Sequence, residues 1–485
     1  MLSQRLQTRA RLERKDDARL SFAADVGTIE LASLSAGQMA AILALQGAGA
    51  TEEALCDIVA RIDGPQAIPW VFLTLTRLAR LGFIETTLSA EGADLATLQP
   101  LARTYQPSSR AVPAGPAVRL CRFSYLHRND SEMLLESPRA LSRIVLHDAR
   151  GMMLLAELTR AVTPQSYGET DRPGISQATA QSFLRMLYQN DFLETDAQTA
   201  DVAQDNAAQA LQQWEFHDLL FHSRSRAGRH RNPWGATYRW EGSRAALPAV
   251  KEVSGEGIAL RRPAAIGDTG SPELGFAAIV EGRRSLRIPG ERPLSKDQLS
   301  EFLFRTSRVR GRMRTEHEEV SNRPYPGGGA DYELEIYPLV QRVEGMERGI
   351  YYYHPLQHRL FHVAGADAGW TALLKEAVEK VRVTQFPDVL FCVTCRFQRL
   401  SYKYSSIAYA IALKDLGALY QTFYLVATAM ELAPCAIGGG NADLFAAVAG
   451  LDYIVEPYIG EFILSSRNET EWARSKPPQV APSER

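Results

Sequence analysis

Two glycine triplets in the C-terminal half constrain the fold of this chain more than any other feature of its sequence. The first, at 327–329 within PYPGGGADYELEIY, stands directly before a stretch (332–336) in which apolar and acidic residues alternate. Because side chains on a strand alternate with period two, this stretch predicts a strand. The second triplet, at 438–440, ends a segment (400–440) that predicts a long and nearly all-apolar helix. A backbone without Cβ atoms can lie flat against a ligand, so the two loops predict one planar or phosphorylated ligand held from both sides.

A Lys-Tyr pair, Lys403 and Tyr404, stands between a predicted strand (389–397) and the start of the long predicted helix. The N-terminus of a helix carries partial positive charge, which favours a neutral amine and a phenolate. We therefore expect Lys403 to be partly neutral, so that it can accept a proton at about pH 7, and Tyr404 to share or relay that proton. The alternative is that Lys403 caps the sheet or contacts a phosphate.

An arginine-rich segment, GRRSLR at 282–287, precedes both glycine triplets. If this segment is extended, Arg283, Ser285 and Arg287 lie on one side, where two guanidiniums and a hydroxyl suit a phosphate and a ribityl chain. Taken alone, such a run is more often a solvated group of charges. Its order before both glycine loops favours the ligand-binding interpretation.

The three motifs together resemble those of the SagB-type dehydrogenases, the FMN-dependent azoline oxidases of the nitroreductase superfamily, over residues 276–467. The resemblance implies a mixed sheet flanked by helices, with FMN bound at the interface of a homodimer. It implies that Lys403 and Tyr404 serve catalysis, and that a basic residue after the last core strand binds the phosphate, for which Arg467 is favoured over Arg474 and Lys476. The other FMN-binding residues that it implies are Arg283, Arg284, Ser285, Arg287, Pro326, Gly327, Gly328, Ile437, Gly438 and Gly439. Gly327 replaces a serine that the family often has, so any hydroxyl contact from that position is missing.

The reaction that the resemblance implies is the oxidation of thiazolines or oxazolines to thiazoles or oxazoles in a ribosomally made peptide, with oxygen as the acceptor. This reaction removes a Cα proton, which the adjacent imine and carbonyl acidify, and transfers a hydride to the flavin. The flavin supplies the redox chemistry, while the protein supplies the base and the orientation. Two alternatives are an NAD(P)H-dependent nitroreductase acting on small molecules and a non-catalytic scaffold that delivers peptide to a cyclodehydratase.

An imperfect repeat organises the N-terminal half. Each unit shows a helix, a further helical segment and a third helix that ends in a strand-like exit, LGFIE at 81–85 and NDFLE at 190–194. This order is typical of winged-helix domains, and it resembles the PqqD-like domains that bind leader peptides. The alternatives are a structural or dimerising winged helix and a DNA reader. The third helix of the first unit carries only Arg77 and Arg80 as basic residues, so we do not expect DNA binding.

A segment between the repeat and the C-terminal half (214–242) contains a basic cluster, which predicts a solvated arm or a second contact to the phosphate or the peptide. The cluster consists of Arg224, Arg226, Arg229, His230 and Arg231. His217 and His222 are five residues apart, which is poor spacing for one metal ion on a helix face. The segment is similar to one in SagB-type oxidases fused to recognition domains, such as those of cyanobactin pathways, which extends the resemblance to nearly the whole chain.

Cys392 and Cys395 form a CxxC pattern on a predicted strand. Residues three apart on a strand face opposite sides, so these two thiols could not easily hold one metal ion. We interpret them as two buried small side chains and predict no metal site. Cys435 is interpreted as packing near the flavin.

Composition and charge set the remaining expectations. The 485-residue chain has a formal net charge of −2, which gives no support to binding of nucleic acid or of an anionic membrane. The N-terminal segment lacks an apolar core typical of a secretion signal, and the apolar segment at 416–432 is too polar for a clean membrane span, so a cytoplasmic protein is predicted. An all-apolar helix must be buried in protein, and a subunit interface would bury this one.

The predicted organisation is α+β, with two winged-helix (PqqD-like) domains followed by a nitroreductase-like FMN domain. The predicted boundaries are 1–110 and 111–200 for the two winged-helix domains, 201–275 for a linker with a helix and a basic arm, and 276–485 for the oxidase domain. The partners that the resemblance implies are an azoline-containing precursor peptide, a second copy of the chain and a YcaO-type cyclodehydratase.

Overall fold

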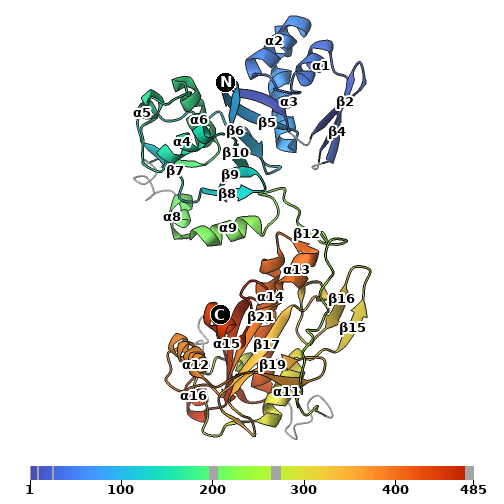
Figure 1. Cartoon of the computed structure of the whole chain (residues 1–485), viewed down its shortest axis with the longest axis vertical. Helices are drawn as coiled ribbons and strands as arrows, with labels where there is room; N and C mark the ends of the chain where they lie inside the picture. The colour runs from blue at the N-terminus through green and yellow to red at the C-terminus, as the bar shows by residue number, and fades with distance from the viewer. Residues whose placement is uncertain (1, 8–9, 25–26, 196–205, 264–274, 476–485) are drawn as a thin grey trace, which may run out of the picture. The chain divides into compact units, whose positions relative to one another are not determined.

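The computed structural model describes residues 2–7, 10–24, 27–195, 206–263 and 275–475 (Figure 1). The chain forms two compact units, Met1–Asn232 and Pro233–Arg485. The first unit contains the repeat, and the second contains both glycine triplets and the Lys-Tyr pair. The division falls inside the stretch that the sequence assigns to a linker.

Each repeat in the first unit folds as three helices followed by a strand, which confirms the predicted order. The elements of the first repeat are α1 (Ala36–Leu43), α2 (Glu52–Asp63), α3 (Ile68–Leu81) and β5 (Ile84–Ala90). Those of the second are α4 (Ala149–Glu157), α5 (Pro164–Glu169), α6 (Gln177–Gln189) and β11 (Leu193–Thr195). Polar caps fix the helix starts: the side chain of Thr51 accepts from the Ala54 amide, and that of Ser176 from the Thr179 amide.

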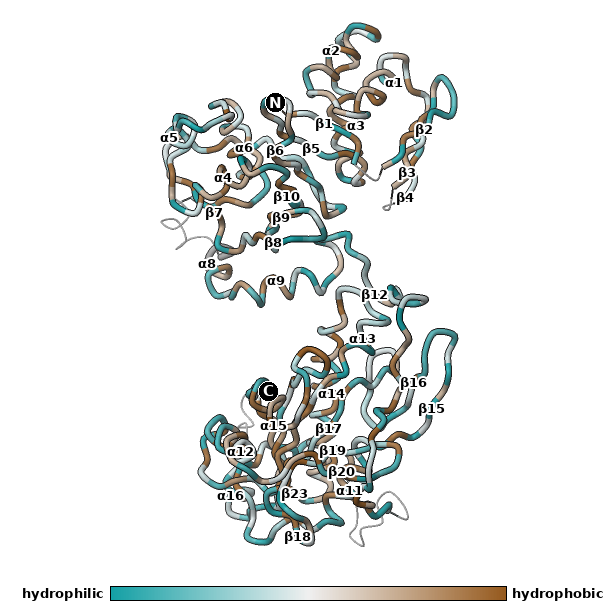
Figure 2. The backbone as a smooth tube through the Cα atoms, viewed as in Figure 1, coloured by the Kyte–Doolittle hydropathy of each residue, from teal (hydrophilic) through white to brown (hydrophobic). Residues whose placement is uncertain are grey.

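One six-stranded antiparallel sheet joins the two repeats, so the repeats share a single core. Its strand order is β1 (Leu2–Leu6), β5, β6 (Ala93–Pro100), β10 (Ser142–Leu146), β9 (Glu132–Glu136) and β8 (Tyr125–Asn129). The two repeats meet where β6 pairs with β10, with Thr97 opposite Val145. A separate three-stranded sheet consists of β2 (Arg11–Asp16), β3 (Arg19–Ala24) and β4 (Gly27–Leu31), and β2 is largely hydrophilic (Figure 2).

The basic cluster after the second repeat is held against the first unit at several points, so the prediction of a solvated arm is wrong for part of it. Arg224, in α9 (Phe216–Arg224), forms a 3.0 Å ion pair with the buried Glu136. Arg229 donates to the Arg139 carbonyl at 3.0 Å, and Arg231 donates to the Arg80 carbonyl. These contacts account for the positions of the three arginines without the predicted second contact to a phosphate.

The second unit is built on a seven-stranded sheet. Its order is β13 (Ile258–Ala259), β20 (Arg359–Gly365), β19 (Gly349–His354), β17 (Leu334–Val340), β21 (Val389–Cys395), β24 (Tyr458–Ser466) and β23 (Leu432–Ile437). Every neighbouring pair in this sheet is antiparallel, so the expectation of a mixed sheet is wrong.

Helices cover both faces of this sheet, which explains why its central strands are buried along their whole length. On one face, α11 (Lys296–Ser307) and α14 (Ala408–Ala429) pack against side chains such as Leu334 and Phe391. On the other face, α12 (Ala368–Val381) and α15 (Ala442–Ala449) pack against Tyr337 and Leu390. Cys395 belongs to the first core and Cys392 to the second, which confirms that the two thiols face opposite sides.

The long apolar helix is α14, and it lies partly uncovered. Its inner side contributes Leu416, Leu419 and Phe423 to the core, whereas Leu413 is 40% exposed. Within the described residues, no helix combines the length and the apolar character needed to cross a membrane.

Candidate active site

The candidate site lies at the edge of the second sheet where β17 begins and β21 ends. Leu334 pairs with Cys395, so the loop that enters β17 and the chain that leaves β21 are neighbours. The loop carries the first glycine triplet, and its last residues form a short 3-10 turn, Gly328–Ala330. The chain after β21 forms α13 (Phe397–Lys403) and then β22 (Tyr404–Ser405).

The first glycine loop (326–329) packs directly on the Lys-Tyr pair, although the two are far apart in sequence. The ammonium of Lys403 donates to the Gly329 carbonyl at 2.9 Å. Gly329 has φ +61°, and a Cβ there would collide with the Tyr404 hydroxyl and lie 2.7 Å from Lys403 Nζ. The Gly328 amide donates to Asp415 of α14 at 2.8 Å. Glycine is therefore needed at 329 because protein side chains approach the backbone closely.

The position predicted for Lys403 is wrong. Lys403 is the last residue of α13, and α14 begins only at Ala408, so the amine does not lie at the N-terminus of the long helix. Its Nζ lies 3.1 Å from Glu318 Oε1 and 3.6 Å from Asp331 Oδ1. Burial lowers the pKa of Lys403, but Asp331 and Glu318 more than offset this and raise the pKa above its ordinary value. Lys403 is therefore an ammonium ion, not the partly neutral amine that the sequence suggested.

Tyr404 is likewise a phenol and not a phenolate. Burial raises the pKa of Tyr404, and the neighbouring Lys403 opposes this only in part. Both members of the pair thus hold their protons, and both can donate hydrogen bonds.

Buried carboxyl groups lie close to this pair, and they were not predicted from the sequence. Burial, followed by repulsion from Glu318, raises the pKa of Asp331 to about 7. Burial, followed by repulsion from Asp415, raises the pKa of Glu333 to about 8. The predicted alternation over residues 332–336 runs into the start of β17, but its acidic side is as buried as its apolar side. Helices cover both faces of β17, so its acidic side chains are buried together with its apolar ones.

A strap (residues 233–244) from the predicted linker crosses the chain at Lys403. Its strand β12 (Gly235–Ala236) pairs with β22, and the amides of Thr237 and Tyr238 both donate to the Lys403 carbonyl, at 2.8 and 3.1 Å. The Thr237 and Ser405 hydroxyls lie 2.7 Å apart. The Tyr238 ring centroid is 5.9 Å from Lys403 Nζ. Sequence reasoning missed these residues because a two-residue strand has no periodicity to detect.

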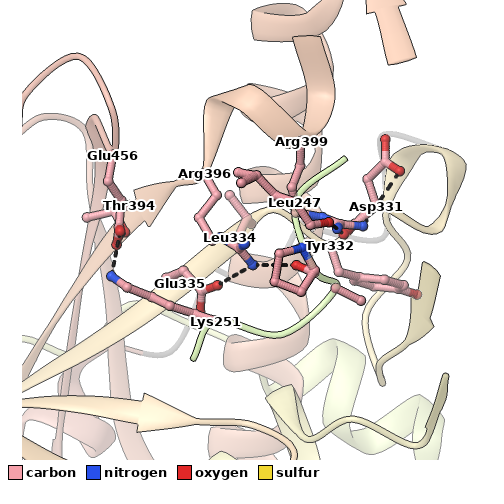
Figure 3. Close-up of polar contacts among 12 residues, drawn as sticks. Leu247, Lys251, Asp331, Tyr332, Leu334, Glu335, Thr394, Arg396, Arg399 and Glu456 are labelled. Carbon is pink, nitrogen blue, oxygen red and sulfur yellow. Dashed lines mark hydrogen bonds and ion pairs between the residues drawn. The ribbon is translucent and has the colours of Figure 1, made fainter. Parts of the chain in front are cut away.

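Arg399 fixes the next part of the same segment to the site. It donates to the Leu247 carbonyl at 2.6 Å and to the Asp331 carbonyl at 2.9 Å (Figure 3). Its neighbour Arg396 lies 3.5 Å from Glu335 and donates to the Pro248 carbonyl. Buried guanidiniums thus hold residues 247–248 against the sheet edge.

The arginine segment (283–287) lies at the opposite end of the sheet. It follows α10 (Phe276–Gly282), and its Leu286 amide donates to the Pro434 carbonyl of β23 at 2.8 Å. The hydroxyls of Ser285 and Tyr424 are 2.7 Å apart, and the Arg283 guanidinium is 5.2 Å from the Tyr424 ring. The Leu286 amide therefore holds the segment against β23, and the side chains of Ser285 and Arg283 hold it against α14.

Two arginine side chains of this region lie close to the ring of Trp472. The guanidinium of Arg284 lies 3.7 Å from the ring centroid of Trp472, and that of Arg467 lies 5.1 Å from it. Arg467 also pairs with Glu431 at 3.1 Å and Glu469 at 2.8 Å. The structure thus brings Arg467 to the arginine segment, while Arg287 is exposed.

The first glycine loop and the arginine segment, both predicted to bind the cofactor, do not lie next to each other within one chain. Asp415 contacts the first glycine loop and Tyr424 contacts the arginine segment, and these residues are nine positions apart on α14. At a rise of about 1.5 Å per residue, they are separated by roughly 14 Å.

The second glycine loop (438–440) lies at the same sheet edge as the first. Ile437 pairs with Glu461, which pairs with Cys392 in turn, so the loop leaves β23 toward the end where β17 begins. Two strands, β21 and β24, separate the loops, which corresponds to roughly 14 Å. A Cβ at Gly438 or Gly439 would meet open space, and Pro326 of the first loop is exposed.

Three family models match consecutive parts of the chain. The model of the ThcOx helix-turn-helix domain matches residues 2–109, that of the cyanobactin oxidase ThcOx matches 118–231, and that of the nitroreductase family matches 280–460.

Curated relatives match the C-terminal half. A protein of Methanocaldococcus jannaschii, named as a nitroreductase, is 28% identical over 34% of this chain and 79% of its own length. The trifolitoxin-processing protein TfxB of Rhizobium leguminosarum bv. trifolii is 26% identical over 39% of this chain and 51% of its own length. The microcin B17-processing protein McbC of Escherichia coli is 30% identical over 29% of this chain and 53% of its own length. The chain thus spans about half the length of the two peptide-processing relatives.

The second unit is therefore a nitroreductase-like domain of mixed helix and strand content. The helix-turn-helix and ThcOx models match most of the first unit, so the chain is similar to the cyanobactin oxidase ThcOx in this unit as well.

Proposed function

We propose that this protein is an FMN-dependent azoline oxidase. It oxidises thiazolines or oxazolines to thiazoles or oxazoles in a ribosomally made peptide, in the cytoplasm and with oxygen as the acceptor. The observation that carries the proposal is the contact of Lys403 and Tyr404 with the exposed Gly329 of the first glycine loop, in a nitroreductase-family domain. The names of two relatives, which process trifolitoxin and microcin B17, support a peptide substrate.

The residues present suit an anionic flavin nucleotide. Arg283, Arg287 and Arg467 supply guanidiniums for a phosphate, and Ser285 supplies a hydroxyl. The uncrowded backbone at Gly438 and Gly439 leaves room for a flat ring system at the sheet edge. We assign FMN contacts to Arg283, Arg284, Ser285, Arg287, Pro326, Gly327, Gly328, Ile437, Gly438, Gly439 and Arg467. When bound, FMN supplies the hydride acceptor.

We assign catalysis to Lys403 and Tyr404. The Lys403 amine accepts the Cα proton of the azoline after its own proton has left, while the Tyr404 phenol donates a hydrogen bond to the substrate. Tyr404 can do so because its raised pKa keeps the phenolic proton in place.

A homodimer is part of the proposal. The first glycine loop contacts α14 at Asp415 and the arginine segment contacts it at Tyr424, while the exposed Leu413 and Gly417 lie on the outer side of the helix. If two copies of α14 cross antiparallel in a two-fold interface, the arginine end of one chain faces the Lys403 end of the other. Such an interface also buries the apolar outer side of α14.

For the first unit we propose peptide recognition, with the division at about residues 110, 200 and 275 that the sequence predicts. A YcaO-type cyclodehydratase, which makes azolines, is the proposed partner enzyme. Support comes from the match of the first unit to the ThcOx models.

The test begins with the purified protein. We expect it to be yellow, to release FMN on denaturation at about one per chain, and to remove two hydrogens from each azoline of a cyclised peptide. The competing nitroreductase function predicts instead NAD(P)H-dependent reduction of a nitroaromatic compound with no change in the peptide. A colourless protein that FMN does not reconstitute would rule out the flavin assignment.

A further inference from the structure

Lys403 belongs to a buried group of two cations and two carboxylates. Its Nζ lies 3.1 Å from Glu318 and 3.6 Å from Asp331. Arg399 Nη2 lies 4.0 Å from each of the same two carboxylates. The side chains of Glu318, Asp331 and Arg399 are at most 2% exposed, so this group is almost completely removed from water.

Three separate segments supply these side chains, which shows that the group is built by the fold. Glu318 lies in the turn between β15 (Gly311–Arg314) and β16 (Glu319–Asn322). Asp331 ends the 3-10 turn before β17, and α13 supplies both cations.

Arg399 is the fixed charge of the group. Its guanidinium donates to the carbonyls of Leu247 and Asp331, at 2.6 and 2.9 Å (Figure 3). It also donates to the Glu319 carbonyl at 3.0 Å. Arginine does not lose its proton in proteins, so within these four side chains Lys403 is the cation that can.

The charge balance then determines the state of Lys403. With Arg399 charged and both carboxylates ionised, a neutral Lys403 leaves an uncompensated negative charge in a buried place, which is costly. An ammonium makes the group neutral. If Lys403 is to become a base, its proton must pass to one of the carboxylates, and Glu318 is already within hydrogen-bond distance.

We propose that Glu318 and Asp331 are positioning residues that hold Lys403 as an ammonium ion at rest and take its proton when the reaction needs the neutral amine. The inference rests on the proposed function. The proton leaves Nζ for a carboxylate oxygen, and the freed lone pair on Nζ accepts the Cα proton of the azoline. The ammonium is thereby restored, and the carboxyl group releases its proton to solvent. A bound flavin would accept the hydride that balances the reaction. The pKa of Asp331, raised to about 7 by burial and by Glu318, suits a group that takes and releases a proton near neutral pH.

Other ionisable groups face this set and stay unchanged in the test. They are Tyr404 and Tyr238 beside Lys403, His317 and Tyr402 beside Glu318, Arg396 beside Arg399, and Glu333, Asp415 and Arg323 behind Asp331.

The test is the pH dependence of azoline oxidation in the full-length protein. In the wild type the rate rises with pH as the coupled group of Lys403, Glu318 and Asp331 loses a proton. Glu318→Gln and Asp331→Asn each remove one negative charge beside the ammonium, so the rising limb moves to lower pH by roughly 1 to 3 units. Glu318→Asp keeps the charge and moves the limb much less. Glu316→Gln removes an exposed carboxylate two positions away and leaves the limb in place. A limb that stays at its wild-type position in Glu318→Gln and Asp331→Asn would overturn the inference.

A second measurement needs no substrate. In protein labelled with ¹³Cε-lysine, the Lys403 signal is assigned by its loss in Lys403→Arg and is titrated in the wild type, Glu318→Gln and Asp331→Asn. A lower titration midpoint in both variants supports the inference, and an unchanged midpoint overturns it. If the wild type does not oxidise azolines, the proposed function fails, and this titration still decides whether the two carboxylates set the charge of Lys403.

Discussion

Lys403 is the side chain on which the proposed reaction depends most, because the proposal assigns to it the removal of the Cα proton. Its surroundings include the Gly329 carbonyl, two carboxylates and the Tyr404 phenol. Each of these favours a positive charge on Nζ or leaves it undisturbed. The reaction therefore requires a step that removes this charge before the amine can act as a base.

Gly329 is the residue at which the glycine requirement of the first loop is tested. In Gly329→Ala, the new Cβ collides with Tyr404. The alanine must also adopt the backbone conformation with φ +61° that this position has. We expect kcat to fall while flavin remains bound, and the protein to lose roughly 1 kcal/mol or more of stability. Gly365→Ala is the control, because its Cβ would meet open space. Unchanged kcat in Gly329→Ala, measured beside its thermal midpoint, would show that the close approach has no role in catalysis.

The residue types and their order in the sequence predict which side chains form the site. They do not predict the protonation states of those side chains, which depend on residues that the fold brings close. The glycine loop, Lys403 and Tyr404 could be found from the motifs, and the structure brings them together. Glu318 could not be found, because it lies in a turn between two short strands and meets Lys403 only through the fold. The prediction of a neutral amine failed for the same reason: it used only the sequence neighbours of Lys403.

At the scale of elements, the sheet edge and α14 arrange the site. The antiparallel register places both glycine loops at one edge and the arginine segment at the other, and α14 runs between the two ends. Strands and the long helix were predictable from their apolar content. The start of α14 was not, because α13 and the two-residue strand β22 intervene between the Lys-Tyr pair and the helix.

The arginine segment should determine whether flavin is retained. Arg283→Ala and Arg287→Ala each remove a charge-assisted contact, which typically contributes about 1.5–3 kcal/mol. We expect the double variant to be purified with much less FMN per chain, as measured by absorbance after denaturation. Arg314→Ala removes an exposed arginine of β15 and serves as the control. Full FMN content in the double variant would contradict the assignment of the segment.

The outer side of α14 should hold the dimer together. Leu413→Glu places a charge on the exposed apolar side of the helix, where burial in an interface would be costly. We expect this variant to sediment as a monomer in analytical ultracentrifugation and to bind FMN weakly. Leu356→Glu, which changes a similarly exposed leucine between β19 and β20, should leave the dimer intact. A dimeric Leu413→Glu would move the interface to another surface.

At the scale of the whole molecule, the chain combines two compact units with separate cores. Every residue assigned to catalysis or to FMN lies in the second unit, and the repeat with its shared sheet lies in the first. The repeat was visible in the sequence. The joining of the two repeats into one sheet was not visible in the sequence, because pairing between β6 and β10 depends on contacts between the repeats.

Removal of the first unit should separate peptide recognition from chemistry. Because the second unit has its own cores, we expect Pro233–Arg485 to keep its flavin. We expect KM for a long azoline peptide to rise while kcat changes little, as measured by steady-state kinetics. KM values that are equal for the full chain and the truncated protein with every peptide tested would leave the first unit a structural role only.

In the proposed function, Lys403 and Tyr404 carry out azoline oxidation beside a bound flavin. The most direct measurement is mass spectrometry of an azoline peptide after incubation with the wild type, Lys403→Ala and Tyr404→Phe, with the visible spectrum of each protein recorded in parallel. We expect the wild type to remove two hydrogens per ring, and both variants to remain yellow while the rate falls by roughly 10²–10⁴-fold. A Lys403→Ala protein that stays yellow and oxidises azolines at the wild-type rate would contradict this claim.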